Sequence, residues 1–303
     1  MPEVLADQEN YQITFHVSLN SATRPLVISF GSQPNGKGSS GFGTSFLLNS
    51  GYDTIYVSQK LGTQYQGLSL EQFYSAVKNK VDGRDVVTYG ASLGGYAALY
   101  YGGCINARII AAAPRQSSWP PLEHPKWSKI DFVHEELWQA TTSKNSTTVF
   151  YDTKLAKDSK MVDEMVLRAY PEARLVKLEY TGHVVLKPFQ NAGILKNLIR
   201  SLIDLDIVIS FELPTENCPE WTLNKGRDLI KKTPVEGRRL LNQSFYLLPN
   251  RRSYESLLVS LVREGLIDDA RILIQDCVRL TGSRIEVNGG ILDLLERHGL
   301  NHV

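Results

Sequence analysis

The sequence predicts an α/β domain with a mostly parallel sheet, followed by a smaller helical domain. Three observations support this fold class. Short β-branched or apolar runs alternate with helical patterns from residue 11 to about 205. A Gly-x-Ser-x-Gly sequence stands between one such run and a helical pattern, and the periodicity becomes helical toward the C-terminus. With 303 residues, the chain is long enough for about two domains.

Apolar runs predict the strands of the first domain, and one-sided apolar spacing predicts its helices. Because strands separated by helices need crossover connections, we expect most of the sheet to be parallel. The predicted strands are 11–17, 25–30, 54–57, 85–89, 108–112, 147–151 and 175–178, and the predicted helices are 69–80, 95–101, 160–169 and 193–203.

The Gly-x-Ser-x-Gly sequence is Gly90-Ala91-Ser92-Leu93-Gly94. Between a strand and a helix, it is typical of a nucleophile elbow, a sharp turn that exposes the serine hydroxyl above the sheet. Strand and helix pass close together there, which requires glycine two residues before and after the serine. The helix start lets the N–H of Leu93 hold a developing oxyanion. The sequence thus predicts a serine hydrolase with Ser92 as nucleophile; the alternative is a glycine-rich turn without chemistry.

A serine hydroxyl needs a base to attack an ester at neutral pH, usually a histidine whose tautomer is fixed by a carboxylate. In this fold, the order along the chain is serine, acid, histidine. His183 follows a predicted strand and precedes a predicted helix, so we expect it to be the base. The histidines that fit less well are His16 in the first strand, His124 and His134 before the expected acid, and His298 and His302 in the C-terminal tail.

The acid is expected after the predicted strand at 147–151. Asp152 stands directly at the end of this strand, where the backbone holds a carboxylate rigidly. Asp158 is the alternative, but it precedes the next predicted helix closely enough to be its N-cap. We therefore expect Asp152 to be the acid, with Asp158 as the second choice.

The loop after the predicted strand at 25–30 is rich in glycine, which lets backbone N–H groups point toward a ligand. We expect the N–H of Ser32 to be the second oxyanion donor, with that of Gln33 as the alternative. The loop lacks the Gly-x-x-x-x-Gly-Lys-Ser/Thr of a phosphate-binding loop, and the chain lacks His-Glu-x-x-His and metal-spaced cysteine pairs. The sequence therefore predicts neither a cofactor nor a metal.

Residues 10 to about 205 resemble the α/β-hydrolase superfamily, most strongly in Gly-Ala-Ser-Leu-Gly-Gly-Tyr-Ala-Ala-Leu. The resemblance implies a triad of Ser92, Asp152 and His183. The Tyr-Asp strand end and the Thr-Gly-His sequence are similar to members linked to bacterial surface-glycan biosynthesis and accessory secretion, which include acyl-group esterases and transferases. The chain departs from the lipase pattern because Phe30-Gly31-Ser32 stands where many members carry His-Gly.

The alternation of strands and helices lapses at 114–146, after the carboxyl end of a predicted strand, where ligands bind in open α/β sheets. This insertion holds Trp119, Trp127 and Trp138. It predicts either a small lid with an aromatic wall facing the substrate, or a long excursion that its tryptophans anchor to the core.

The sequence changes character after Asp206, which divides the chain into a catalytic domain at 1–205 and a helical domain at 206–303. Residues 225–252 hold eight basic and two acidic residues, which predicts either contact with an anionic polymer, membrane surface or acidic partner, or a solvated helix face. Prolines at positions 214, 219, 234 and 249 break the first part of this domain into short pieces.

Three helical patterns follow from Ser253 onward. Gly265 suits the end of the first helix and Asp268 the N-cap of the second, which predicts a helical hairpin. The pattern over 254–270 resembles one tetratricopeptide or pentatricopeptide repeat, but one copy does not establish a solenoid.

Composition limits the class of protein. A formal net charge of +1 gives no electrostatic reason to expect nucleic acid or an anionic membrane. The three cysteines are far apart, so we expect reduced thiols in a cytoplasmic protein. The N-terminus lacks the apolar core of a signal peptide, and no apolar stretch approaches about 18 residues. We therefore expect neither cleaved export nor a transmembrane segment.

The expected function is that of an esterase or deacylase that forms an acyl-Ser92 intermediate, with a small-molecule or glycan ester as substrate. An acetyl or other short acyl group on a sugar or polymer is the first class to test. The same triad also supports acyl transfer to an alcohol. In a third reading, the protein is a non-catalytic adaptor that binds a protein partner through its C-terminal helices.

Overall fold

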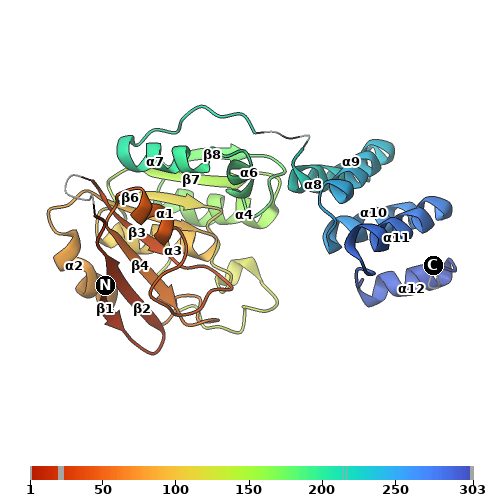
Figure 1. Cartoon of the computed structure of the whole chain (residues 1–303). Helices are drawn as coiled ribbons and strands as arrows, with labels where there is room; N and C mark the ends of the chain where they lie inside the picture. The colour runs from red at the N-terminus through yellow and green to blue at the C-terminus, as the bar shows by residue number, and fades with distance from the viewer. Residues whose placement is uncertain (1, 20–23, 214, 216, 301–303) are drawn as a thin grey trace. The chain divides into compact units, whose positions relative to one another are not determined.

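The computed structural model describes residues 2–19, 24–213, 215 and 217–300 (Figure 1). They form two compact units, the first made of Met1–Glu179 and His183–Glu212, and the second of Tyr180–Gly182 and Leu213–Val303. The first unit therefore continues beyond residue 205, where the sequence places the end of the catalytic domain. None of the helices in the described part of the chain has the length and apolar character that a membrane crossing requires.

The first unit is built on one sheet of eight strands in the order β1-β2-β4-β3-β5-β6-β7-β8. β2 pairs antiparallel with β1 and β4, and all pairs from β4 to β8 are parallel. This confirms the predicted α/β class with a mostly parallel sheet. The strands are β1 (Glu3–Asp7), β2 (Tyr11–His16), β3 (Leu26–Phe30), β4 (Thr54–Gln59), β5 (Val86–Ala91), β6 (Arg108–Ala112), β7 (Thr147–Asp152) and β8 (Arg174–Leu178).

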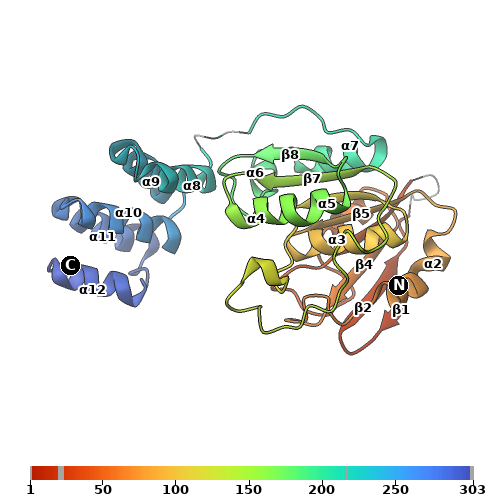
Figure 2. The same cartoon turned by 180° about the vertical axis from the view of Figure 1, so that it is seen from behind.

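Helices cover both faces of this sheet. Figure 1 shows α1 and α7 in front of it, and Figure 2 shows α3, α4 and α5 on the opposite face. β3, β4 and β7 are buried along their whole length, as parallel strands covered on both faces must be. The helices are α1 (Thr44–Asn49), α2 (Leu70–Val81), α3 (Leu93–Cys104), α4 (Ala156–Met161), α5 (Leu167–Ala169), α6 (Lys187–Asn191) and α7 (Leu195–Leu205).

Every predicted strand of the first unit is present, with ends within two residues of the predicted ones. The helix predicted at 160–169 begins earlier, at Ala156, and reaches α5 through a π-helical turn at Val162–Val166. The sequence analysis did not predict β1, α1 or α6. β1 is a largely exposed edge strand and the two helices are short, so none of them carries a strong apolar pattern.

The insertion at 114–146 is held to the first unit by its aromatic side chains. Its regular structure is one 3₁₀ turn, Pro120–Leu122. Trp119 is buried, and its Nε1 donates to both carboxylate oxygens of Glu136 at 3.1 Å. The guanidinium of Arg168 lies over the Trp138 ring, 3.4 Å from its centroid. These contacts match the anchoring role that the sequence analysis proposed as one of two readings.

The second unit contains five helices in its described residues. The helical hairpin predicted after Ser253 is present as α10 and α11, and it packs on α8, α9 and α12 through a shared apolar core that includes Leu241, Phe245 and Leu258. The helices are α8 (Pro219–Leu229), α9 (Pro234–Leu247), α10 (Arg251–Arg263), α11 (Ile267–Thr281) and α12 (Gly289–Arg297).

One prediction about the ends of these helices is wrong, that of Asp268 as an N-cap. Pro219 and Pro234 separate short pieces of the chain, as predicted, and each is the first residue of a helix, because proline is compatible with the first turn of a helix. Pro214 lies outside the described residues. Asp268 is not an N-cap: Leu266 has that position, and Asp268 lies in the first turn of α11. Gly265 does follow the end of α10, with a φ of 72°.

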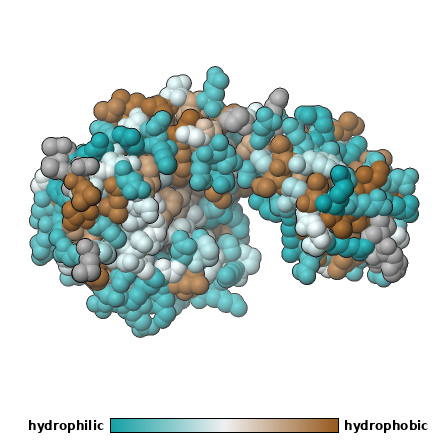
Figure 3. Space-filling model, in the orientation of Figure 1, coloured by the Kyte–Doolittle hydropathy of each residue, from teal (hydrophilic) through white to brown (hydrophobic). Residues whose placement is uncertain are grey.

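Several basic side chains of 225–252 form ion pairs. Arg238 pairs with Glu264, and Arg239 and Arg251 pair with Glu236 and Glu255 at 2.8 and 2.9 Å. These ion pairs agree with a solvated helix face, which is one of the two interpretations that the sequence allows for this segment. The visible surface of the unit is mostly hydrophilic with scattered apolar groups (Figure 3).

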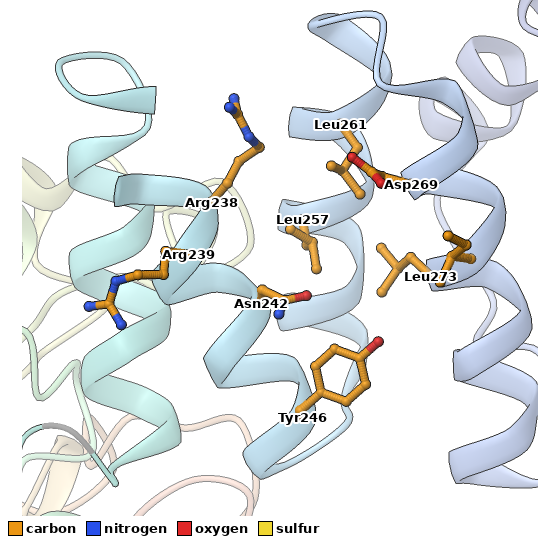
Figure 4. A pocket seen from close by; sticks show the side chains of 9 residues that line it. Arg238, Arg239, Asn242, Tyr246, Leu257, Leu261, Asp269 and Leu273 are labelled. Carbon is orange, nitrogen blue, oxygen red and sulfur yellow. The ribbon is translucent and has the colours of Figure 1, made fainter. Parts of the chain in front are cut away.

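A small cavity of about 280 Å³ opens between α9, α10 and α11 (Figure 4). Its wall combines the Arg238, Asn242 and Tyr246 side chains of α9 with leucines of α10 and α11.

Candidate active site

Ser92 stands at a strained turn between β5 and α3. Its φ of 54° and ψ of −122° place it outside the usual regions for a residue other than glycine. Three backbone hydrogen bonds hold the turn: Ser92 N–H donates to Ala112 O at 2.8 Å, and Ser92 O accepts from the N–H groups of Arg115 and Tyr96 at 2.9 and 3.1 Å. Such a strained serine at the end of a strand has the geometry expected of a nucleophile elbow.

The glycines on either side are required by close backbone contacts. A Cβ atom on Gly90 would lie 2.0 Å from Gly94 O, and one on Gly94 would lie 2.5 Å from Phe30 O. Neither backbone can move away without separating β5, α3 and β3. The structure thus supplies the physical reason that the sequence analysis gave for the spacing.

His183 lies between β8 and α6, as predicted, and its ring reaches the serine. Its Nε2 is 2.7 Å from Ser92 Oγ. The side chain of His183 is 25% exposed, so the ring lies at the floor of an open site and not in the core.

The carboxylate on the other side of the ring belongs to Asp158. His183 Nδ1 is 2.9 Å from Asp158 Oδ2 and 3.1 Å from Oδ1. The preference for Asp152 was therefore wrong, and the alternative acid holds this position. Because the carboxylate is fully buried, an Nδ1–H donor directed at it fixes the tautomer that leaves Nε2 free to accept the serine proton.

Both carboxylates were candidates because they lie close together in the sequence. Asp152 is the last residue of β7, and its Oδ1 accepts a hydrogen bond from the N–H of Lys154 at 2.8 Å, which stabilises the turn that leaves the strand. Asp158 is not the N-cap of α4, which is Leu155, but the third residue of the helix. The early start of α4 therefore frees Asp158 from a capping role and points its side chain toward the histidine.

Arg115 is a site residue that the sequence analysis missed. Its Nε donates to Asp158 Oδ1 at 3.0 Å, and its Nη2 forms a short ion pair with the same oxygen. The same residue donates its backbone N–H to Ser92 O. Arg115 therefore connects the elbow to the acid. No motif indicates it, because its role depends on the chain path after β6.

Two of the predicted oxyanion donors line the same cavity as the serine, and the third directly follows the serine in the chain. Ser32 and Gln33 line the same cavity as Ser92, and Leu93 begins α3. Within the described part of the chain, the backbone N–H groups of these three residues donate to no protein acceptor. The Gln33 Nε2 is also buried and without a partner among the described residues. The site thus offers several donors beside one hydroxyl.

A cavity of about 720 Å³ opens onto Ser92 and His183. The loop after β3, α1, the end of β5, α6 and α7 contribute its walls. The lining residues include none from 114–146, so the tryptophans of the insertion do not form a wall of this cavity. Among the described residues, no group of three or more histidine, cysteine or acidic side chains is arranged to hold a metal ion.

The other histidines lie away from this site. His16 Nε2 is 2.7 Å from Ser39 O, and His134 is buried against α3, where its Nδ1 is 2.9 Å from the hydroxyl of Tyr96. His124 stays in the insertion near Trp127, and His298 follows α12 in the second unit. His302 lies outside the described residues.

No family model matches the chain, and no curated protein matches its sequence significantly. Solved structures do match. They include the Glycosylation Associate Protein (Gap123) complex from Streptococcus agalactiae, with 14% identity, a TM-score of 0.48, and coverage of 66% of this chain and 46% of that chain. Esterase 2 from Thermogutta terrifontis has 11% identity, a TM-score of 0.46, and coverage of 70% and 96%. A structure described as a putative thioesterase from Silicibacter sp. has 14% identity, a TM-score of 0.43, and coverage of 68% of this chain and 82% of that chain.

The strand order and the elbow of the first unit are those of the α/β-hydrolase fold, the fold of the superfamily that the elbow sequence resembles.

Proposed function

We propose that the protein is a serine hydrolase that cleaves carboxylic esters through an acyl-Ser92 intermediate. One observation carries this proposal: a continuous line of hydrogen bonds joins Ser92 Oγ, His183 and the buried Asp158 carboxylate, and it ends in an open cavity. This arrangement of nucleophile, base and orienting acid is the one that acyl transfer by serine requires.

In the first half of the reaction, Ser92 Oγ attacks the ester carbonyl carbon while His183 Nε2 takes the hydroxyl proton. The carbonyl oxygen becomes an oxyanion, which the N–H of Leu93 and that of Ser32 or Gln33 stabilise. When the intermediate collapses, the bond to the leaving alcohol breaks, and the alcohol takes the proton from His183. Water then attacks the acyl-serine by the same steps in reverse order, and releases a carboxylic acid.

A fluorophosphonate probe tests the proposal directly. We expect it to label the native protein at Ser92 and to leave Ser92→Ala unlabelled, with equal circular dichroism spectra for both. Ser201→Ala is a matched control, because Ser201 lies on α7 and its hydroxyl donates to Ile207 O. Absence of labelling in well-folded protein would refute a reactive serine.

Acyl transfer to an alcohol is a variant of the same mechanism, in which an alcohol replaces water in the second half. The substrate for comparing hydrolysis with acyl transfer is the sugar or glycopolymer ester that the sequence resemblance implies. Product analysis with an acylated sugar and a competing sugar acceptor separates the two. Free acid as the main product supports hydrolysis. Acylated acceptor as the main product, even at a low concentration of the acceptor sugar, supports transfer.

The alternative to an enzyme is a non-catalytic adaptor that binds a protein partner through its C-terminal helices. The cavity that α9, α10 and α11 form supports this alternative. The adaptor function predicts that removal of 213–303 abolishes recovery of a protein partner from cells, and that Ser92→Ala leaves cellular function intact. Loss of function in Ser92→Ala, with partner recovery unchanged by the truncation, contradicts it.

A further inference from the structure

The cavity beside Ser92 is much larger than a short acyl group requires. At roughly 30 Å³ for each water-sized group, a volume of about 720 Å³ has room for a chain far longer than an acetyl group. A site built only for acetyl would leave most of this space to solvent. The size of the cavity therefore favours a substrate whose acyl chain is longer than an acetyl group.

Away from the reactive groups, apolar side chains form much of the cavity wall, and Lys187, Gln190 and Lys196 line it as well. Phe46 comes from α1, Val185 and Leu186 from the segment after His183, and Leu195 and Ile199 from α7. The polar residues Ser92, His183, Ser32 and Gln33 stand where the elbow meets the loop after β3. An ester carbonyl at Ser92 can thus place its hydrocarbon chain against the apolar walls, where burial of apolar surface stabilises the complex.

A tyrosine, Tyr89, also lines the cavity. Tyr89 lies on β5, three residues before Ser92, and its side chain is 3% exposed. The ring stacks obliquely on Phe42, with centroids 4.8 Å apart. Among the described residues, the fully buried side-chain atoms without a hydrogen-bond partner do not include the Tyr89 hydroxyl oxygen, so this oxygen keeps some access to solvent although the ring is buried. A hydroxyl that lines a cavity discriminates against an apolar group that displaces water from it without offering an acceptor.

We propose that this cavity binds the acyl chain of the ester, that the chain is longer than a butyryl group, and that it carries an oxygen atom that accepts a hydrogen bond from Tyr89. This inference rests on the proposed function in one respect: the bound chain is an acyl chain because the protein is proposed to cleave esters. It adds no chemical step to the reaction. Burial also raises the pKa of the Tyr89 hydroxyl, so it remains a donor throughout the neutral pH range.

Carboxylate binding to Ser92→Ala tests chain length without any need for turnover. Calorimetric titration with butyrate, hexanoate, octanoate and decanoate should show about fourfold tighter binding for each further buried methylene group. Leu195→Trp, which fills the cavity, should weaken decanoate binding and leave butyrate binding unchanged. Leu205→Trp is the matched control, because Leu205 is the exposed last residue of the same helix. Equal affinity for all four carboxylates overturns the proposal.

A set of decanoates with a hydroxyl group at successive carbon atoms tests the role of Tyr89. At least one member should bind Ser92→Ala about tenfold or more tightly than decanoate, and this advantage should disappear when Tyr89→Phe is added. Tyr74→Phe is the control, because Tyr74 is an exposed residue of α2. An advantage that persists in Tyr89→Phe, or its absence at every position, overturns this part.

The two proposals fail in different ways. If the fluorophosphonate labels Ser92 but decanoate binds no better than butyrate, the protein is a serine hydrolase without the acyl-chain site. If decanoate binds as expected but no probe labels Ser92, the cavity binds chains and the proposed hydrolysis is wrong.

Discussion

At the scale of single residues, the acid is the position where sequence and structure differ most. Asp158 shares one carboxylate between His183 and Arg115, and all three side chains are within hydrogen-bond distance. The two partners hold the carboxylate in a fixed orientation against the histidine ring.

Exchanging each candidate acid for its amide distinguishes the two. We expect Asp158→Asn to lower kcat/KM for a p-nitrophenyl ester by about 10³ to 10⁴-fold, because the amide favours the wrong histidine tautomer. Asp152→Asn should lower it by less than about tenfold, since Asp152 accepts from the Lys154 backbone and not from the ring. Equal losses in two folded variants contradict the assignment of Asp158.

Removal of the Arg115 guanidinium should lower the rate of the reaction. We expect Arg115→Gln to lower kcat by about tenfold or more through loss of carboxylate positioning. Steady-state kinetics with a p-nitrophenyl ester measures this loss, and a folded Arg115→Gln variant with the kcat of the parent protein contradicts the positioning role of Arg115.

At the scale of elements, the parallel strands could be predicted because burial on both faces demands continuous apolar runs. The elbow could be predicted because the contact of Gly90 with Gly94 excludes every side chain. The acid could not, because its position depends on where α4 begins, and the sequence analysis placed that start after Asp158. Pro219 and Pro234 separate short pieces of the chain, as predicted, but the sequence analysis did not predict that these pieces are the helices α8 and α9.

The insertion at 114–146 contains a buried histidine, His134, whose hydrogen bonds require a neutral ring. His134 stacks on Tyr100 with centroids 4.2 Å apart, and its Nε2 is 2.9 Å from Tyr65 O. Desolvation by burial lowers the pKa of His134 to about 4. Its Nε2–H can therefore donate to Tyr65 O while its Nδ1 accepts from the Tyr96 hydroxyl.

This pKa predicts a loss of stability in acid. Between about pH 6.5 and pH 4, the unfolded chain binds more protons at His134 than the folded chain, so the free energy of unfolding falls as pH is lowered. The contribution is about 3 kcal/mol, fully present above pH 6.5. Urea unfolding of the protein and of His134→Gln should show a smaller pH slope for the variant, which starts from lower stability at pH 7. Parallel slopes contradict the prediction.

At the scale of the whole molecule, each unit has a core of its own. The core of the second unit includes Leu241, Phe245, Leu258 and Leu273. Its helices begin with prolines or with the Asn250 capping box, which are local signals. The sequence analysis expected a change of domain after residue 205, but it did not predict α8 and α9, the helices of the second unit before residue 250.

A chain of residues 213–303 should fold alone. We expect a helical circular dichroism spectrum and a cooperative thermal transition, because its helices bury their apolar faces against one another. A matched variant, Leu258→Ala, should lower the free energy of unfolding by about 2 to 5 kcal/mol, since Leu258 is fully buried. A disordered spectrum for the parent fragment indicates that the second unit needs the first in order to fold.

Arg115 has a consequence for the engineering of this protein. The residue is the second of the insertion, and it connects Ser92 O to Asp158. Replacement of residues 114–146 by a foreign segment therefore removes Arg115, which positions the catalytic groups, together with the insertion. A transplant that retains Pro114 and Arg115 and joins the new segment after them keeps this positioning.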